Sequence, residues 1–307
     1  MVIGRLLEHQ IQVRQQSHRG RPALAGVHYL EHRSEHRRAN VGRPRKRSRA
    51  AREEHLRRYY RALQRSWGRQ HWWPASTRFE VIVGAYLTQN TSWTNVEHAL
   101  RKLRSARRLS LQGIRSASLT ELETLIRSSG YFRQKSLRLK VFVDFLDSNY
   151  GGSLRRMFAK PTENLRQELL DLPGIGPETA DSILLYAGQH PVFVVDAYTR
   201  RILERHQIIT PRATYEEIRS LMQKALFPLS AESSSELLNQ VKLNPALHGA
   251  AHPASRMSTT KRSSLAQVFN DTHGFIVSTG KQFCLKTKPL CEHCPLCKFL
   301  PSRVYPA

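Results

Sequence analysis

Hydrophobic positions recur with a helical period along most of the chain. Between about residues 53 and 240 apolar side chains repeat every three or four positions, whereas the alternation typical of strands is scarce. In the segment 180–187 the apolar residues fall at the i, i+3, i+4 and i+7 positions of an amphipathic helix, and leucines line one side of the segment 163–172. Pro177 suits the first turn of the former helix, and Gly188 suits its end. The pattern therefore predicts an all-α fold.

Two segments lack this period. Residues 1–52 contain 13 Lys/Arg and 3 Asp/Glu, a charge of +10, with few large apolar side chains. Such a segment buries too little apolar surface to offset its ordering entropy, so we expect a disordered basic tail and order from Glu53 onward. Residues 242–263 are rich in Pro, Ser, Thr and Ala, which predicts a surface loop or insertion.

The composition favours a nucleic-acid partner. The 307 residues include 49 Lys/Arg and 24 Asp/Glu, which gives a net charge of +25. A chain this basic favours a polyanion, and nucleic acid is the default polyanion. The longest apolar run, about Val81–Leu87, is far shorter than the roughly 20 residues of a membrane span. Met1–Ser17 lacks the apolar core of a secretory signal. We therefore expect no membrane partner, and a monomer that is cytoplasmic and nucleoid-associated if the host is bacterial.

The cysteines predict one local site. All four lie in the last 24 residues, so they do not form a disulfide framework that spans the chain. They are Cys284, Cys291, Cys294 and Cys297. The C-x2-C-x2-C part of this spacing is compatible with a [4Fe-4S] cluster. Zinc is the rival because four thiolates also suit it and His293 is adjacent, and a site without metal is the third alternative.

A five-residue link joins the two predicted helices at 163–172 and 177–188. The link is Leu172, Pro173, Gly174, Ile175 and Gly176. Its two glycines allow a tight turn whose backbone can approach another molecule closely. The helix that follows offers unpaired N–H groups and a positive dipole end to an anion. This arrangement suits one DNA phosphate, bound without regard to base sequence, although an ordinary corner between helices has the same pattern.

The order of motifs after this hairpin resembles a known family. The hairpin and its helix are followed by Val194-Val195-Asp196 and, after four further residues, by Arg201. This order resembles the helix-hairpin-helix DNA glycosylase superfamily, and specifically its endonuclease III-like members. The match extends from about His71 to the last cysteine, with one insertion.

The resemblance implies a two-domain fold. A six-helix barrel would span 78–190 and contain the hairpin. The second domain would combine residues 53–77 with 191–307, including an iron-sulfur loop at 284–297. The DNA groove would lie between the two domains, and the partner would be double-stranded DNA with a damaged base.

In this family the residue at Asp196 is the catalytic carboxylate. Breaking an N-glycosidic bond builds positive charge on the sugar, which a fixed carboxylate stabilises. The same group can orient or deprotonate the attacking water. Asp196 also stands between an apolar run and a helical pattern, which is typical of a helix N-cap without catalytic function.

Bifunctional members carry a lysine two residues after the last glycine of the hairpin. Here Glu178 occupies that position, and no lysine lies between Lys160 and Lys224. A carboxylate cannot form a Schiff base, so the resemblance implies a monofunctional glycosylase with water as the nucleophile. Glu178 is also a typical acid for a helix start.

Several residues are candidates for a base pocket and a wedge. A flipped base needs an aromatic slot, and an electron-rich slot favours a positively charged, N-alkylated purine. The sequence around these positions resembles the 3-methyladenine glycosylase branch, although some of the tryptophans suit a hydrophobic core as well. The implied roles are base stacking for Trp72, Trp73, Tyr86 and Trp93, filling of the vacated gap for Gln89 or Asn90, and wedging of the opposite strand for Tyr131 or Phe132.

Two other functions remain open from the sequence. One is an enzyme for oxidised pyrimidines or mismatched thymine. The other is a DNA-binding module that has kept the hairpin but lost catalysis.

The last cysteine departs from the family spacing. Endonuclease III-like proteins carry C-x6-C-x2-C-x5-C around a [4Fe-4S] cluster, and here the fourth cysteine, Cys297, comes three residues early, with Leu300 in the expected place. On the resemblance we favour the cluster. Its implied role is to hold a basic loop with Lys281, Lys286 and Lys288 against DNA phosphates.

Overall fold

The computed structural model describes residues 48–231 and 252–301 of the chain, and within these ranges it contains helices and no strand. The all-α prediction is confirmed for this part of the chain. The predicted basic tail as far as residue 47 and the predicted loop as far as residue 251 lie outside the described residues.

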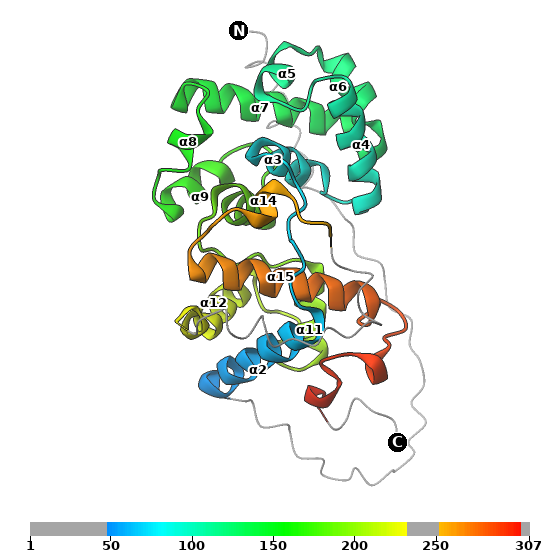
Figure 1. Cartoon of the computed structure of the whole chain (residues 1–307), viewed down its shortest axis with the longest axis vertical. Coiled ribbons are helices and arrows are strands. Elements are labelled where there is room, and N and C mark those ends of the chain that lie inside the picture. The colour runs from blue at the N-terminus through cyan, green and yellow to red at the C-terminus, as the bar shows by residue number, and fades with distance from the viewer. Residues whose placement is uncertain (1–47, 232–251, 302–307) are drawn as a thin grey trace, which may run out of the picture. The chain divides into compact units, whose positions relative to one another are not determined.

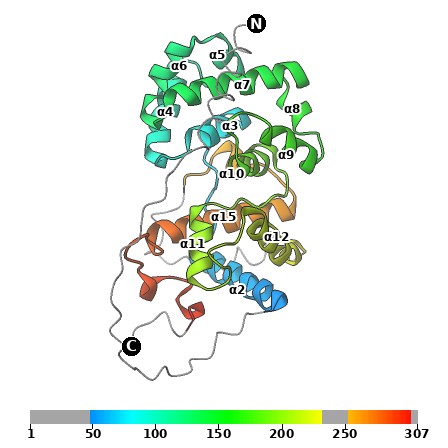
Figure 2. The same cartoon turned by 180° about the vertical axis from the view of Figure 1, so that it is seen from behind.

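Figures 1 and 2 show the described helices in their order along the chain. The first half of the chain forms α2 (Arg49–Trp67), α3 (Arg78–Leu87), α4 (Trp93–Ser105), α5 (Leu111–Ser116), α6 (Leu119–Leu125), η1 (Arg127–Ser129) and α7 (Phe132–Tyr150). The middle forms α8 (Leu154–Met157), α9 (Thr162–Leu170), α10 (Pro177–Ser182), η2 (Ile183–Gly188), α11 (Ala197–Arg205), α12 (Tyr215–Leu226) and η3 (Phe227–Ser230). The last part forms α14 (Arg256–Thr259), α15 (Ser264–Gln282), η5 (Cys291–His293) and η6 (Cys297–Phe299).

The helices gather in two groups. One group is built from α3 to α10, in which α7 packs against α3, α5 and α6, and α10 packs against α9. In the other group α15 packs against α2, α11 and α12, so the N-terminal helix joins the C-terminal part of the chain. Figure 1 shows the first group in its upper half and the second in its lower half. The connection between them is made by η2, which contacts both α3 and α15.

Two boundaries differ from the sequence expectations. Helix α2 begins at Arg49, four residues before Glu53, because the Ser48 side chain accepts a hydrogen bond from the backbone N–H of Ala51 and caps the helix. The C-terminal part of the predicted loop contains α14, which Ser255 caps and whose Met257 is buried.

The helix after the hairpin differs in character from its prediction. It is buried on almost every side, as Ala180, Ile183 and Leu185 illustrate, so it is not amphipathic. Its second half, η2, has π-helical geometry. The helix is buried because it lies at the centre of the fold, where α3, α9 and α15 all contact α10 or η2. Among the described residues no helix is both long and apolar enough to span a bilayer.

Candidate active site

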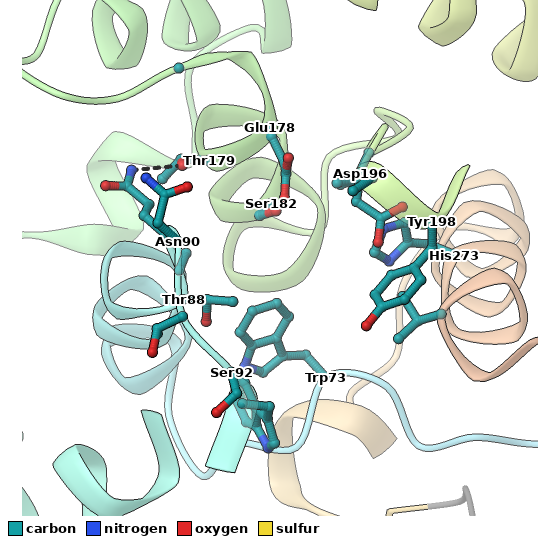
Figure 3. Close-up of a pocket in the computed structure, with 18 of the residues that line it drawn as sticks. Trp73, Thr88, Asn90, Ser92, Glu178, Thr179, Ser182, Asp196, Tyr198 and His273 are labelled. Atoms are coloured by element: carbon teal, nitrogen blue, oxygen red, sulfur yellow. Dashed lines mark hydrogen bonds and ion pairs between the residues drawn. The ribbon is translucent and has the colours of Figure 1, made fainter. Parts of the chain in front are cut away.

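A pocket of about 910 Å³ opens where the hairpin, the α3–α4 connection, the start of α11 and helix α15 meet. Of the fifteen residues predicted for catalysis, the hairpin, the base pocket and the wedge, nine line it: Trp72, Trp73, Gln89, Asn90, Trp93, Gly174, Gly176, Glu178 and Asp196. Figure 3 shows side chains from these separate elements pointing into one space.

Tyr86 is a correction. Its side chain is 1% exposed, it does not line the pocket, and its ring packs against Phe142 of α7 with centroids 5.9 Å apart. Burial raises the pKa of the Tyr86 hydroxyl well above its usual value. The adjacent residue, Ala85, lines the pocket instead. Tyr86 is therefore a core residue between α3 and α7.

The two wedge candidates also lie outside the pocket. Tyr131 is 65% exposed and has a left-handed backbone conformation, with φ of 46°, at the N-terminus of α7. Phe132 is half-buried, packs against the core and lies beneath the guanidinium of Arg127, 4.9 Å from the ring centroid. Of the two, Tyr131 has the free aromatic ring that a wedge needs.

Asp196 uses its two carboxylate oxygens differently. Oδ1 accepts hydrogen bonds from the backbone N–H of Thr199, at 2.7 Å, and from its hydroxyl, at 2.8 Å, and so caps α11. Oδ2 lies 3.6 Å from Nε2 of His273. The side chain is 11% exposed and lines the pocket. One carboxylate thus serves as a helix cap and at the same time presents negative charge, stabilised by the helix N-terminus, to the pocket.

His273 was missed by the sequence interpretation. It is buried on α15, and its Nδ1 lies 2.6 Å from the Tyr186 hydroxyl, while its Nε2 makes no hydrogen bond in the structure. Burial lowers the pKa of His273, opposed by the charge of Asp196. His273 thus lies beside Asp196, and its ring is held in place by Tyr186. The one feature of the sequence that could have indicated His273 as a site residue is its place inside the apolar run of α15.

Glu178 stands in the first turn of α10 and extends into the pocket (Figure 3). Glu178 lines the pocket and is nevertheless exposed to solvent. Partial burial raises the pKa of Glu178 to about 7, and the negative charge of Asp196 contributes to the rise. The two carboxyl groups are therefore close enough to influence one another.

Lys281 lies in the pocket wall rather than only beside the cysteine loop. Its ammonium nitrogen is 5.9 Å from the centroid of the Trp72 ring. Burial lowers the pKa of Lys281, while the charges of Glu97 and Asp196 oppose this shift. The sequence analysis assigned Lys281 to a loop that contacts DNA phosphates, whereas in the structure its amine lines the pocket.

The hairpin is held in a fixed conformation by two side chains. Gly174 has a φ of 77°, and a Cβ at this position would overlap Nε of Arg138. Nε2 of Gln89 donates hydrogen bonds of 2.9 Å to the carbonyl oxygen of Gly174 and to Oγ1 of Thr179. Arg138 in turn donates to Oε1 of Gln89 at 2.9 Å. The glycine thus leaves room for a guanidinium directly beside the predicted phosphate site.

The tryptophans serve both the core and the pocket. Trp73 is 7% exposed, and its ring meets that of Trp93 edge to face with centroids 5.1 Å apart. The ring centroids of Trp72 and Trp73 are 5.7 Å apart. Tyr198, in the first turn of α11, also lines the pocket and was missed by the sequence interpretation. The pocket therefore has aromatic surface on several sides.

The four cysteines line one smaller cavity of about 130 Å³. Arg205 of α11 donates a hydrogen bond to Sγ of Cys284 at 3.2 Å, and it also binds the carbonyl oxygens of Leu285 and Lys286. Within residues 48–231 and 252–301, no three His, Cys, Asp or Glu side chains converge closely enough to hold a single metal ion. The sequence prediction of one local cysteine site agrees with this common cavity.

Comparison with known proteins decides the family. The family model described as HhH-GPD superfamily base excision DNA repair protein matches residues 83–228. A candidate DNA repair glycosylase of Methanocaldococcus jannaschii is 38% identical over 245 residues, which cover 80% of this chain and 94% of that protein. The chain belongs to the HhH-GPD superfamily of base excision DNA repair proteins.

Solved structures confirm the fold of this HhH-GPD glycosylase. The H. pylori 3-methyladenine DNA glycosylase bound to 1,N6-ethenoadenine aligns with a TM-score of 0.55 and 28% identity, over 75% of this chain and 97% of that chain. A non-covalent endonuclease III–DNA complex aligns with a TM-score of 0.58 and 19% identity, over 81% of this chain and 94% of that chain. The predicted superfamily and its all-helical glycosylase fold are therefore confirmed, and the protein is a DNA glycosylase of base excision repair.

Proposed function

We propose that this glycosylase removes an alkylated base from double-stranded DNA by hydrolysis and leaves the strand intact. The observation that carries the proposal is the pair of carboxyl groups, Glu178 and Asp196, in one aromatic-lined pocket, with Glu178 in the place of the family's nucleophilic lysine. A carboxylate cannot form the imine that strand cleavage by bifunctional members requires.

In the proposed reaction Asp196 stabilises the charge that develops on the sugar. The bond between C1′ and the base nitrogen breaks, and positive charge builds on the sugar ring near the fixed carboxylate. The base leaves from a slot walled by Trp73, Trp93 and Tyr198. These electron-rich faces favour a lesion that carries positive charge.

The experiment that tests the proposal is base release from duplexes that each carry one lesion. We expect release of N-alkylated purines to exceed that of oxidised pyrimidines and mismatched thymine. Release of an oxidised pyrimidine in preference to every alkylated base would contradict the proposed substrate class.

We assign the residues that bind the phosphate and separate the two DNA strands from the family pattern. The hairpin binds one phosphate through its backbone, Gln89 or Asn90 fills the space left by the flipped base, and Tyr131 wedges the opposite strand. In the free protein Gln89 donates a hydrogen bond to the hairpin at Gly174. If Gln89 fills the space left by the flipped base, this hydrogen bond is replaced by contacts with DNA.

Alanine at Gly174 tests the hairpin. We expect affinity for damaged and undamaged DNA to fall alike, by about tenfold, because a left-handed alanine costs about 1–2 kcal/mol and its Cβ displaces Arg138. Fluorescence anisotropy at fixed salt measures this. Gly151→Ala is the matched control, because Gly151 also has positive φ but lies outside the pocket. Unchanged affinity in Gly174→Ala would remove the hairpin from DNA binding.

We further propose that the cysteine cavity holds a [4Fe-4S] cluster. The donor set fits this group, because four thiols surround a common cavity and Arg205 offsets the charge that a Cys284 thiolate would carry. When bound, the cluster would act as a rigid structural anchor. The chain's own contribution is to position the loop at 284–297 against α11 through Arg205.

The cluster assignment predicts colour and iron. Purified protein should show broad visible absorbance and about four irons per chain. Replacement of Cys294 with serine should lower the iron content and the melting temperature together. Metal analysis that finds about one zinc and no iron per chain would overturn the assignment.

A further inference from the structure

The carboxyl group of Glu178 is not used by the family's known chemistry. It lies in the first turn of α10, where the positive end of the helix faces the pocket. Among the described residues, no side chain forms a hydrogen bond or an ion pair with it. Figure 3 shows this carboxyl group and that of Asp196 extending into the same space from two different helices.

A sugar bound in this pocket would have access to the carboxyl groups of both Glu178 and Asp196. The position corresponds to that of the lysine that attacks the sugar in bifunctional relatives, and Glu178 lines the same pocket as Asp196. A glutamate side chain is shorter than a lysine side chain and cannot bond to C1′ as an imine. The pocket, of about 910 Å³, has room for a water molecule beside this carboxylate.

We propose that Glu178 is the general base that deprotonates the attacking water, while Asp196 stabilises the positive charge on the sugar. The inference rests on the proposed hydrolytic function and divides its two tasks between two carboxylates. A division of this kind, with two carboxyl groups on either side of one scissile bond, is how glycoside hydrolysis is commonly organised.

The titration of Glu178 supports this role. A general base works best when its pKa lies near the working pH, and the pKa of Glu178 is raised to about 7. The charged and titratable groups around it come from α7, η2, α11, α12 and α15. They are Arg138, Tyr186, Asp196, Tyr198, Tyr215, His273 and Lys281.

The step balances for a base alkylated on a ring nitrogen. The C1′–N bond breaks, its electron pair returns to the cationic ring, and the base departs neutral. The water oxygen bonds to C1′, and one water proton passes to the Glu178 carboxylate. That proton is then released to solvent, which restores the carboxylate for the next turnover.

The experiment is the pH dependence of single-turnover base release at saturating enzyme and fixed salt. For the wild-type protein we expect the rate to rise with pH through about 7 and then level, because the base acts only when ionised. Glu178→Gln should lose about 100- to 10,000-fold in rate and lack this rise. Glu163→Gln is the matched control, because Glu163 is also in a helix first turn but lies outside the pocket.

Chemical rescue separates a base from a structural residue. We expect added formate to restore part of the activity of Glu178→Ala, since a small carboxylate can occupy the vacated space, and to leave the wild type unchanged. A rate for Glu178→Gln within threefold of wild type, or a wild-type rate that falls as pH rises through 7, would overturn the role of Glu178 as general base. Neither result would affect the proposed function. Absence of base release by the wild-type protein from every lesion would instead overturn the proposed function.

Discussion

Asparagine in place of Asp196 is expected to lower base release by at least about 1,000-fold while affinity for DNA stays within a few-fold. The substitution removes the negative charge that stabilises the sugar in the transition state. It keeps the cap, because the amide oxygen of asparagine can still accept the N–H of Thr199. The loss should therefore appear in the rate and not in folding or binding.

Single-turnover kinetics and a melting curve measure this difference. Asp196→Ala should lose the same rate and in addition about 1 kcal/mol of stability, because it also loses the cap. Asp171→Asn serves as the control, since Asp171 is exposed near the hairpin and does not line the pocket. Near-normal turnover by Asp196→Asn would remove this carboxylate from the mechanism.

Lysine in place of Glu178 is expected to convert the enzyme into a strand-cleaving one. The substitution returns an amine to the position that attacks C1′ in bifunctional relatives. Borohydride should then trap a covalent protein–DNA adduct, and nicks should form without alkali. The wild-type protein should give neither, because a carboxylate cannot form an imine.

The variant Lys281→Met is the control for an unexpected adduct in the wild-type protein. The lowered pKa of Lys281 and its place in the pocket wall make it the amine on which an unexpected adduct would form. A wild-type adduct that disappears in Lys281→Met would show that Lys281 acts as a nucleophile. A wild-type adduct that persists in Lys281→Met, with the N-terminal amine blocked, would point to another amine. Either result would contradict the monofunctional mechanism.

The parts of the site that the sequence predicted are those encoded locally. The hairpin glycines, Glu178 and Asp196 are recognisable because their conformations and caps depend on near neighbours in the chain. Each lies at a turn or a helix start, where few residue types are compatible with the backbone. The structure brings them to the lining of one pocket.

The error at Tyr86 has a simple geometric cause. Successive residues of an α-helix point about 100° apart, so Ala85 and Tyr86 on α3 face different neighbours. The sequence identified an aromatic residue near the pocket but not the side of α3 that faces it. The aromatic ring packs on Phe142, and the small side chain of Ala85 faces the pocket.

His273 and Lys281 could not be predicted because their partners are distant in the sequence. Both lie on α15, and they reach Asp196 only because α15 packs against α11. The hydrogen bond between His273 and Tyr186 joins residues 87 positions apart. Contacts of this range depend on the packing of the two helix groups, which hydrophobic periodicity does not specify.

The central claim, hydrolytic removal of a base, is tested most directly by one time course. Wild-type protein is incubated in excess with a duplex that carries one N-alkylated purine, and free base and strand breaks are measured in the same samples. Base should be released in a single exponential, and breaks should appear only after alkali, in an amount equal to the base released. Breaks that accompany base release without alkali, or DNA binding without release of any base, would contradict the account.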